Sequence, residues 1–287
     1  MREPPGDRSP AELLEFGVVN LDKPPGPSAH QVAAWVRDMA GVDRAAHTGT
    51  LDPKVTGCLP MLLGDATRLA QVFDDSVKEY VAVLELHGPA PADLSATLAE
   101  FEGEIYQKPP KKSAVVRRLR TREVYDLEAL EVEERRALLR IRCESGTYVR
   151  KLCHDIGLAM GTGAHMGDLR RVGTEPFDDT DLVTLQGFAD ALAWAEEGDT
   201  GPLEEAVQPA ERALVDLPRV TIAESAARAV AEGAPVYAPG VIDADDADEK
   251  SLVACYTPDG AAVCLGRLVG DPASESGTVV DLERVLV

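Results

Sequence analysis

The pattern of apolar side chains in residues 138–161 constrains the fold more than any other feature of this chain. Residues 138–144 (LLRIRCE) alternate apolar and charged side chains, which predicts a strand with one buried face and arginines on its open face. In residues 149–160 apolar side chains recur every three or four positions, which predicts an amphipathic helix that Gly161 ends. Residues 78–87 (KEYVAVLELH) predict a further strand. Because strands and helices mix without the rhythm of βαβ units, we expect an α+β fold with a mixed, largely antiparallel sheet flanked by helices.

The composition and the residue pattern of the sequence divide the chain into three parts. Residues 1–12 are polar and rich in proline, and we expect a flexible tail there. The part from 13 to 215 contains the segments above, together with a predicted helix over 28–40 and a helical region over 182–197. From 216 to 287 the pattern changes to short strands with turns at PG and PDG, which predicts a small β-barrel domain.

The charge of the chain is strongly unbalanced. Fifty acidic residues face 29 basic ones, only eight of them lysine, and the formal net charge is −21. Excess carboxylate with few lysines is typical of proteins from salt-loving organisms, because at about 1 M salt the Debye length is only about 3 Å and self-repulsion is screened. An ordinary acidic protein is the alternative, and we favour a halophilic archaeal source.

Other features of the composition exclude several classes of protein. The five cysteines form no C-x-x-C pair and are odd in number, so we expect reduced, mostly buried thiols and neither a disulfide framework nor a zinc site. The sequence contains neither a nucleotide-binding fingerprint nor metal-ligand spacing, so we expect no cofactor. No apolar run is long enough to span a membrane, and the polar N-terminus lacks the apolar stretch of a signal peptide. We therefore expect a cytoplasmic protein with no membrane partner.

The segment HTGTLDPKVTGCLP, residues 47–60, is the sharpest candidate for a functional loop. Gly49 and Gly57 bracket Asp52, and Pro53 stiffens the chain directly after it. This composition favours a fixed loop that presents one carboxylate. For an isolated Asp-Pro pair, an ordinary turn would be the better interpretation.

Two cations at the start of the helix over 149–160 form a second signal. Arg150 and Lys151 lie in its first turn, where each cation opposes the helix dipole by about 0.3–1 kcal/mol. Either an anion such as Asp52 or an RNA phosphate offsets this cost, or both side chains simply point into solvent.

A basic segment, residues 108–122 (KPPKKSAVVRRLRTR), reverses the local charge of an acidic protein. It contains seven cations and no acidic residue, and a basic stripe of this kind is typical of phosphate contacts. We therefore expect RNA-backbone contacts from this segment, from Lys151 and from the Arg-Arg pair that follows Leu169. The residues concerned are Lys108, Lys111, Lys112, Arg117, Arg118, Arg120, Arg122, Lys151, Arg170 and Arg171.

Five ordered motifs resemble those of one enzyme family. HTGTLDP, with GVVNLDKPPGPS before it, resembles the TruB/dyskerin family of RNA pseudouridine synthases, and KEY, GTYVRKL and DLRR are similar to its remaining motifs. GEIYQKPPKKSAVVRRLRTR and CESGTYVRKLCHDIG resemble the archaeal and eukaryotic dyskerin branch. The C-terminal part is similar to a PUA domain, the RNA-binding module of that family. The resemblance implies a pseudouridine synthase catalytic domain followed by a small β-barrel PUA domain.

The resemblance also implies roles for individual residues. Asp52 corresponds to the catalytic aspartate, as either a nucleophile or a base, and Tyr80 to the tyrosine that stacks on the flipped uracil. Arg150 corresponds to the arginine that pairs with the aspartate, and Leu169 to a leucine of the base pocket. His47 and Lys23 correspond to residues that shape the site and assist RNA binding.

Three functions remain open at this point. The resemblance implies a synthase in an H/ACA guide ribonucleoprotein, with guide RNA and accessory proteins, acting on rRNA. It also implies an enzyme acting alone on the T-loop uridine of tRNA. The insertion with which bacterial members grip that loop is absent after Gly88, which favours the first function, and the two are compatible. A non-catalytic RNA-binding scaffold is the third hypothesis, which the intact set of Asp52, Tyr80 and Arg150 disfavours.

Overall fold

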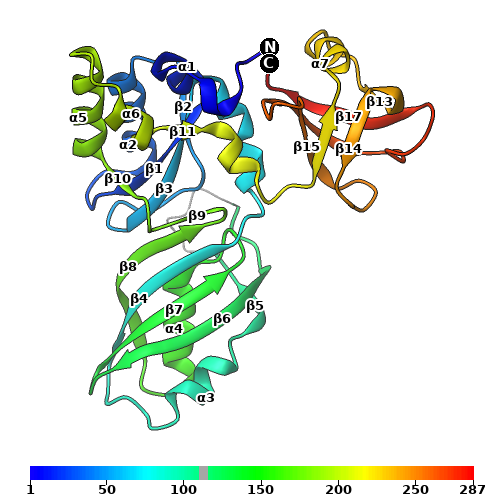
Figure 1. Ribbon diagram of the computed structural model, residues 1–287. Helices are drawn as coiled ribbons and strands as arrows, with labels where there is room; N and C mark the ends of the chain where they lie inside the picture. Colours follow the sequence, from blue (N-terminus) through cyan, green and yellow to red (C-terminus); the bar gives the residue numbers. More distant parts are fainter. Residues whose placement is uncertain (110–115) are drawn as a thin grey trace.

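The computed structural model describes residues 1–109 and 116–287 and contains two sheets (Figure 1). The larger sheet has the strand order β10-β1-β3-β8-β4-β7-β6-β5, with β2, β9 and β11 paired at its sides. Among its described strands only two pairs, β1 with β10 and β3 with β8, are parallel. Its strands are β1 Gly17–Lys23, β2 Ala45–His47, β3 Thr56–Leu63, β4 Lys78–Leu86, β5 Gly103–Gln107, β6 Arg120–Val132, β7 Arg136–Cys143, β8 Ala164–Thr174, β9 Phe177–Asp178, β10 Val183–Thr184 and β11 Gln208–Pro209. The predicted mixed, largely antiparallel sheet is confirmed.

Helices cover this sheet in two groups (Figure 1). One group contains α2, which packs against β2 and β3, and α5, which contacts α2 and β1; the other contains α4, which packs against β4 and β8. The helices of this part are α1 Pro10–Glu15, α2 Ala29–Ala40, α3 Leu94–Ala99, α4 Val149–Ala159, α5 Leu185–Glu196 and α6 Gly201–Ala206, with 3-10 turns η1 Pro5–Asp7, η2 Gly64–Phe73 and η3 Ala210–Leu214. None of the helices in the described ranges is both long and apolar enough to cross a membrane.

The local sequence explains the elements that frame the site. On β4 every second side chain is buried, so Lys78, Tyr80 and Ala82 share the inner face. Helix α2 begins where the Ser28 hydroxyl accepts a hydrogen bond from the backbone N–H of Gln31, and it ends at Gly41 with a left-handed φ of 65°. The predicted strands over 78–87 and 138–144 and the predicted helices over 28–40 and 149–160 are thus confirmed.

The C-terminal part forms a second, six-stranded sheet with the order β13-β17-β16-β15-β12-β14. Its elements are β12 Arg219–Ile222, α7 Glu224–Ala231, β13 Val236–Tyr237, η4 Ala238–Gly240, β14 Val241–Ala244, β15 Leu252–Tyr256, β16 Ala262–Leu268 and β17 Thr278–Val285. One cluster of buried side chains joins this part to the larger one, since Phe16 and Val18 of the first pack with Tyr256 and Leu265 of the second. All five cysteines are buried and free, as the sequence predicts.

The expectation of a flexible tail at residues 1–12 is corrected by the structure. Ser9 and Glu12 form a reciprocal capping box at the start of α1. Arg8 is buried and makes two hydrogen bonds of 2.7 Å to the carboxylate of Glu211. Arg2 donates to the Leu286 carbonyl oxygen, so the two chain ends lie together (Figure 1). The cause is an ion pair with a residue 203 positions away, which a local sequence pattern does not contain.

Candidate active site

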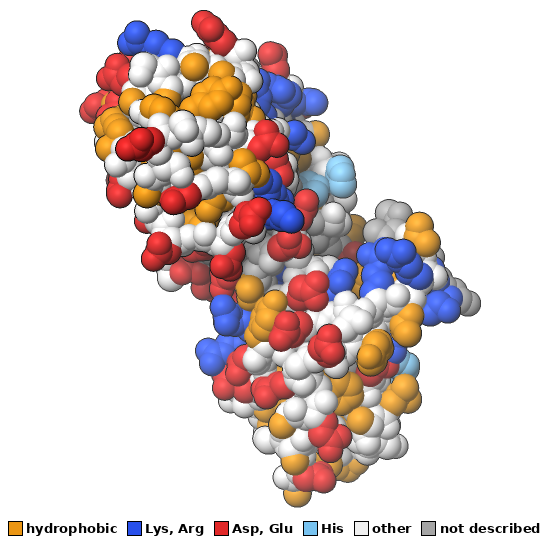
Figure 2. Space-filling view, turned by 90° about the vertical axis from the view of Figure 1, so that its right-hand side faces the viewer, with side chains coloured by type: hydrophobic (Ala, Val, Ile, Leu, Met, Phe, Trp, Pro, Cys, Tyr) orange, Lys and Arg blue, Asp and Glu red, His pale blue; other side chains and the backbone are white. Residues whose placement is uncertain are grey.

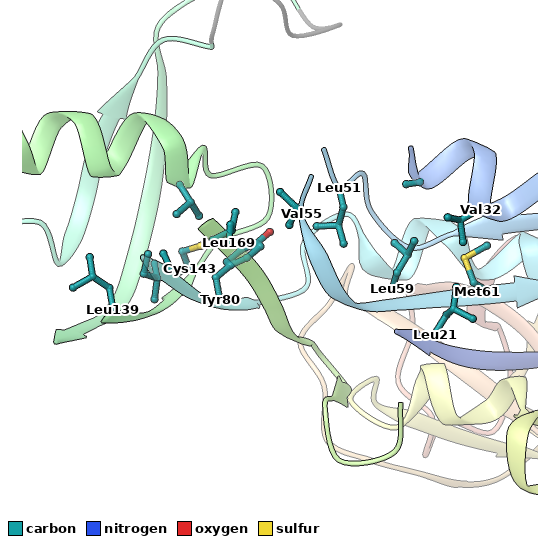
Figure 3. Close-up of a cluster of buried hydrophobic side chains, with 14 of the residues drawn as sticks. Leu21, Val32, Leu51, Val55, Leu59, Met61, Tyr80, Leu139, Cys143 and Leu169 are labelled. Atoms are coloured by element: carbon teal, nitrogen blue, oxygen red, sulfur yellow. The ribbon is translucent and has the colours of Figure 1, made fainter. Parts of the chain in front are cut away.

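The loop between β2 and β3 presents Asp52 to solvent. Leu51 and Val55 are 4% and 5% exposed and belong to the main core, whereas the side chain of Asp52 between them is 54% exposed. Figure 3 shows both apolar side chains directed toward Tyr80 and Leu169. The N–H of Val55 donates to the Asp52 carbonyl oxygen at 3.0 Å and closes the turn. Two buried anchors therefore hold the loop, and the carboxylate projects from it.

Gly57 ends this loop at a position that excludes a side chain. Its φ is 98°, and a Cβ atom there would lie 2.1 Å from the Arg171 carbonyl oxygen. Glycine thus allows the start of β3 to lie directly against β8.

Lys23 binds the backbone of the Asp52 loop from inside the protein. Its side chain is fully buried, and its ammonium donates to the carbonyl oxygens of Pro24 (2.9 Å), Pro53 (3.1 Å) and Val55 (2.8 Å). Burial lowers the pKa of this lysine. Because its amino group has no exposed surface, the expected contact of Lys23 with RNA is wrong, whereas its expected part in shaping the site agrees with these bonds.

Arg150 forms an ion pair with Asp52 from the first turn of α4. Each of the two side chains is about half exposed, at 53% and 54%. Lys151, the neighbouring cation, pairs with Asp155 on the same helix. Both cations of the first turn therefore have a carboxylate partner, which is the compensation that the helix dipole predicts. The pairing of Lys151 leaves it less suited to the expected RNA contact.

Tyr80 and Leu169 lie side by side on β4 and β8, next to the Asp52 loop (Figure 3). Tyr80 is 9% exposed and Leu169 is 8% exposed. Burial raises the pKa of the Tyr80 phenol, so it stays protonated. Tyr80 and Leu169 thus lie beside the loop that carries Asp52, and the three residues come from three different segments of the chain.

Arg171 lies inside the protein and cannot contact RNA. It is 1% exposed, and its Nε donates to the Cys58 carbonyl oxygen at 2.7 Å. Its neighbour Arg170 points the other way and makes a bidentate ion pair with Asp22, at 2.9 and 3.1 Å. The expectation that the pair binds RNA phosphates is therefore wrong for Arg171, because residues 169 and 171 share the buried face of β8.

His47 lies at the end of β2, directly before the loop. Its Nε2 lies 3.4 Å from Nδ1 of His30, and the two rings meet edge to face. Burial lowers the pKa of His47 to about 4, and the charges of His30 and Arg171 act in the same direction. His47 is therefore uncharged at neutral pH. The sequence reasoning missed His30, which is the second residue of the helix that begins after Ser28.

The structure describes residues 108, 109 and 116–122 of the basic segment. Lys108, Arg117 and Arg118 are exposed, and Arg117 also donates to the Pro109 carbonyl oxygen at 3.1 Å. Arg120 is half-buried, and Arg122 faces Glu144 at 3.3 Å. Figure 2 shows Lys and Arg side chains gathered around the hollow between the two halves of that face, whereas acidic side chains are scattered over both. Lys111 and Lys112 lie outside the described residues.

Family models match almost the whole chain. The model described as "TruB family pseudouridylate synthase (N terminal domain)" matches residues 37–91 and 88–149, and "tRNA pseudouridylate synthase B C-terminal domain" matches 150–215. A relative from Halobacterium salinarum, named "Probable tRNA pseudouridine synthase B", is 67% identical over 299 residues, which cover 100% of this chain and 99% of the relative. The chain belongs to the TruB family of pseudouridylate synthases. It is therefore an isomerase of the pseudouridine synthase type.

Further comparisons place the chain in the archaeal branch of the TruB family. A relative of the same printed name from Haloarcula marismortui is 66% identical over 100% of this chain and 94% of its own. The crystal structure of a Cbf5-Nop10-Gar1 complex contains a chain that is 44% identical, with a TM-score of 0.94 over 100% of this chain and 89% of that one. A structure of an H/ACA RNP bound to a substrate RNA with 2′-deoxyuridine matches at 42% identity and a TM-score of 0.92, over 99% and 89% of the two chains. The halophilic relatives agree with the acidic composition.

Two smaller models match the ends of this TruB-family chain. The PUA domain model matches residues 218–273, as the change of texture from 216 predicts. A model described as "DKCLD (NUC011) domain" matches residues 3–33. The N-terminal segment is thus part of a recognisable domain, in agreement with the buried Arg8.

Proposed function

We propose that this enzyme converts uridine to pseudouridine in RNA with Asp52 as its essential carboxylate. The observation that carries the proposal is one half-exposed carboxylate, paired with Arg150, on a fixed loop that adjoins Tyr80 and Leu169. The domain division that goes with it assigns catalysis to residues 13–215 and further RNA contacts to residues 216–287.

The reaction moves one bond and needs no redox partner. The N1–C1′ bond breaks, uracil rotates, and a C5–C1′ bond forms; the C5 proton passes to water and N1 gains a proton. A carboxylate next to the sugar supports this sequence either by attacking C1′ or by removing the proton at C2′. Arg150 places a positive charge beside the Asp52 carboxylate, and both routes use that group as a carboxylate anion.

The uracil must leave its stack before Asp52 can reach the sugar. Extrusion of a base costs a few kcal/mol, and stacking on an aromatic ring returns about 1–3 kcal/mol. Tyr80 is the aromatic residue beside the Asp52 loop, and Leu169 provides an apolar wall next to it. A flipped uracil that stacks on Tyr80 would therefore lie next to the carboxylate.

The RNA backbone follows the exposed cations of the basic segment in this proposal. Lys108, Arg117 and Arg118 are exposed and supply positive charge in a chain whose formal net charge is −21. Lys111 and Lys112 extend the same stretch of sequence. Arg170 remains available in part, since its side chain is 38% exposed beside Asp22.

We further propose that the chain is the catalytic subunit of an H/ACA guide ribonucleoprotein acting on rRNA, and that it also modifies the T-loop uridine of tRNA. The solved structures of Cbf5 with Nop10 and Gar1, and of an H/ACA RNP with its substrate RNA, support guide RNA and accessory proteins as partners. The name tRNA pseudouridine synthase B of the relatives supports tRNA as a second substrate.

Mapping of pseudouridine in total RNA, with and without the gene, tests this proposal. We expect sites to disappear both in rRNA and at the tRNA T-loop. Loss of the tRNA site alone would contradict the guide-dependent role, and loss of rRNA sites alone would contradict the tRNA role. An unchanged map would contradict both.

A further inference from the structure

The contact between His30 and His47 links helix α2 to the start of the Asp52 loop. His30 lies in the first turn of α2, and His47 is the last residue of β2, five positions before Asp52. Their ring nitrogens Nδ1 and Nε2 are 3.4 Å apart, and the ring centroids are 4.6 Å apart at an interplanar angle of 82°. This geometry allows one N–H···N hydrogen bond between the rings.

The surroundings of His47 decide which ring donates that hydrogen bond. Nδ1 of His47 is buried and has no hydrogen-bond partner among the described residues. A buried N–H without a partner is rarer and costlier than a buried acceptor without one, so Nδ1 should carry no proton. His47 is uncharged, because burial lowers its pKa to about 4. Its one ring proton is therefore on Nε2, which faces Nδ1 of His30.

Other contacts hold the remaining sides of the loop. Lys23 binds the carbonyl oxygens of Pro53 and Val55 after Asp52, and Arg171 binds the Cys58 carbonyl oxygen at its far end. At the near end the N–H of Thr48 donates to the Pro60 carbonyl oxygen, whereas the Thr48 hydroxyl has no partner within the described residues. His47 is the residue directly before the loop at this end, and its ring meets His30.

We propose that His30 is a positioning residue for the active site: its Nδ1 accepts a hydrogen bond from Nε2 of His47 and so fixes the tautomer and orientation of that ring at the entry to the Asp52 loop. The expected effect of His30 on turnover rests on the proposed function of Asp52. The hydrogen bond itself is a property of the free enzyme.

Nitrogen-15 NMR of the histidine rings tests the hydrogen bond without substrate. The full chain contains only five histidines, so their ring signals are assignable by single substitutions. We expect His47 to show a protonated Nε2 and an unprotonated Nδ1. His30→Ala should shift the His47 ring signals, and His30→Asn should restore them, because the Asn side-chain oxygen takes the place of Nδ1 as acceptor.

A second histidine pair supplies the matched control. His87 Nε2 and His165 Nδ1 are 3.0 Å apart. This pair lies at the C-terminal end of β4, whereas Tyr80 lies near the start of that strand. His165→Ala should leave the His47 signals unchanged. A His47 ring protonated on Nδ1, or signals that do not respond to His30→Ala, would overturn the proposal.

Turnover of a tRNA transcript labelled with tritium at uridine C5 tests the consequence. His30→Ala should lower kcat by about 2- to 10-fold, the range that one hydrogen bond contributes, with little change in KM. His30→Asn and His165→Ala should both turn over like the parent. An unchanged kcat in His30→Ala would overturn the positioning role. Failure of the parent enzyme on this RNA would count against the tRNA role, while the ring spectra would still decide the hydrogen bond.

Discussion

Arg150 and Asp52, 98 positions apart in the chain, form an ion pair that joins helix α4 to the loop between β2 and β3. The first turn of a helix is an unfavourable place for a cation, because the positive end of the helix dipole lies there. The Asp52 carboxylate offsets that cost for Arg150.

Replacement of Arg150 by Gln should separate activity from stability. Both side chains of the pair are half exposed, so the free energy of unfolding should fall by less than about 1 kcal/mol. We expect kcat to fall roughly 10- to 100-fold, since a misplacement of about 1 Å at a reacting group costs on the order of 100-fold. Arg140→Gln, which breaks the equally exposed pair with Glu128, is the control and should leave turnover unchanged. Parent-like turnover of Arg150→Gln would show that the pair has no part in the reaction.

The buried ion pair between Arg8 and Glu211 should be important for stability. Glu211 also accepts a hydrogen bond from the N–H of Ala262 at 3.0 Å, so it connects the N-terminal segment to β16. Arg8→Met leaves a buried carboxylate without its cation and should lower the free energy of unfolding by about 3–5 kcal/mol. Denaturant unfolding at a fixed high salt concentration measures this loss.

A matched control for Arg8 is Arg37→Met. Arg37 pairs with Asp38 on the surface of α2, where both side chains are largely exposed, and the change should cost less than about 1 kcal/mol. Equal losses for the two variants would contradict the buried position of Arg8.

Salt should stabilise this protein. The formal charge of −21 makes self-repulsion large at low ionic strength, and counter-ions screen it progressively. We expect the melting temperature to rise as KCl increases from about 0.1 to 3 M, concentrations that span the screening range. A melting temperature that is flat or falls over this range would contradict adaptation to high salt.

Lys78 should make stability depend on pH in the alkaline range. Burial lowers its pKa from 10.5 to about 7, so between these values the unfolded chain binds a proton that the folded chain does not. The unfolding free energy therefore rises with pH from about 7 to 10.5, by at most about 1.4 kcal/mol per pH unit from this group. Lys78→Met should flatten that rise, whereas Lys54→Met, an exposed lysine, should not. Equal slopes for the parent and Lys78→Met would contradict the lowered pKa.

Periodicity alone predicted the elements that surround the site. The alternation over 78–87 and the helical spacing over 149–160 reflect which side chains are buried, and the structure has β4 and α4 at these places. The dipole argument for Arg150 also pointed to a carboxylate partner. These inferences succeed because they depend on neighbours within one element.

The sequence did not separate buried cations from exposed ones. The family resemblance implied an RNA contact for Lys23 and the Arg-Arg pair one for Arg171, yet both side chains point inward and bind backbone carbonyl oxygens. For Arg171 a signal existed, because it is two residues from Leu169 and must share its face of a strand. For Arg8 the partner is 203 residues away, so only the assembled fold could identify it.

The measurement that tests the central claim most directly is tritium release from C5-labelled uridine in RNA by the variant Asp52→Asn. Asn keeps the shape of the side chain and removes its charge, and the expected loss of stability is small, on the order of 1 kcal/mol. RNA affinity should persist, since it derives mainly from phosphate contacts elsewhere. We predict a folded variant that binds RNA and releases no tritium. Release at the rate of the parent enzyme would eliminate Asp52 as the catalytic carboxylate.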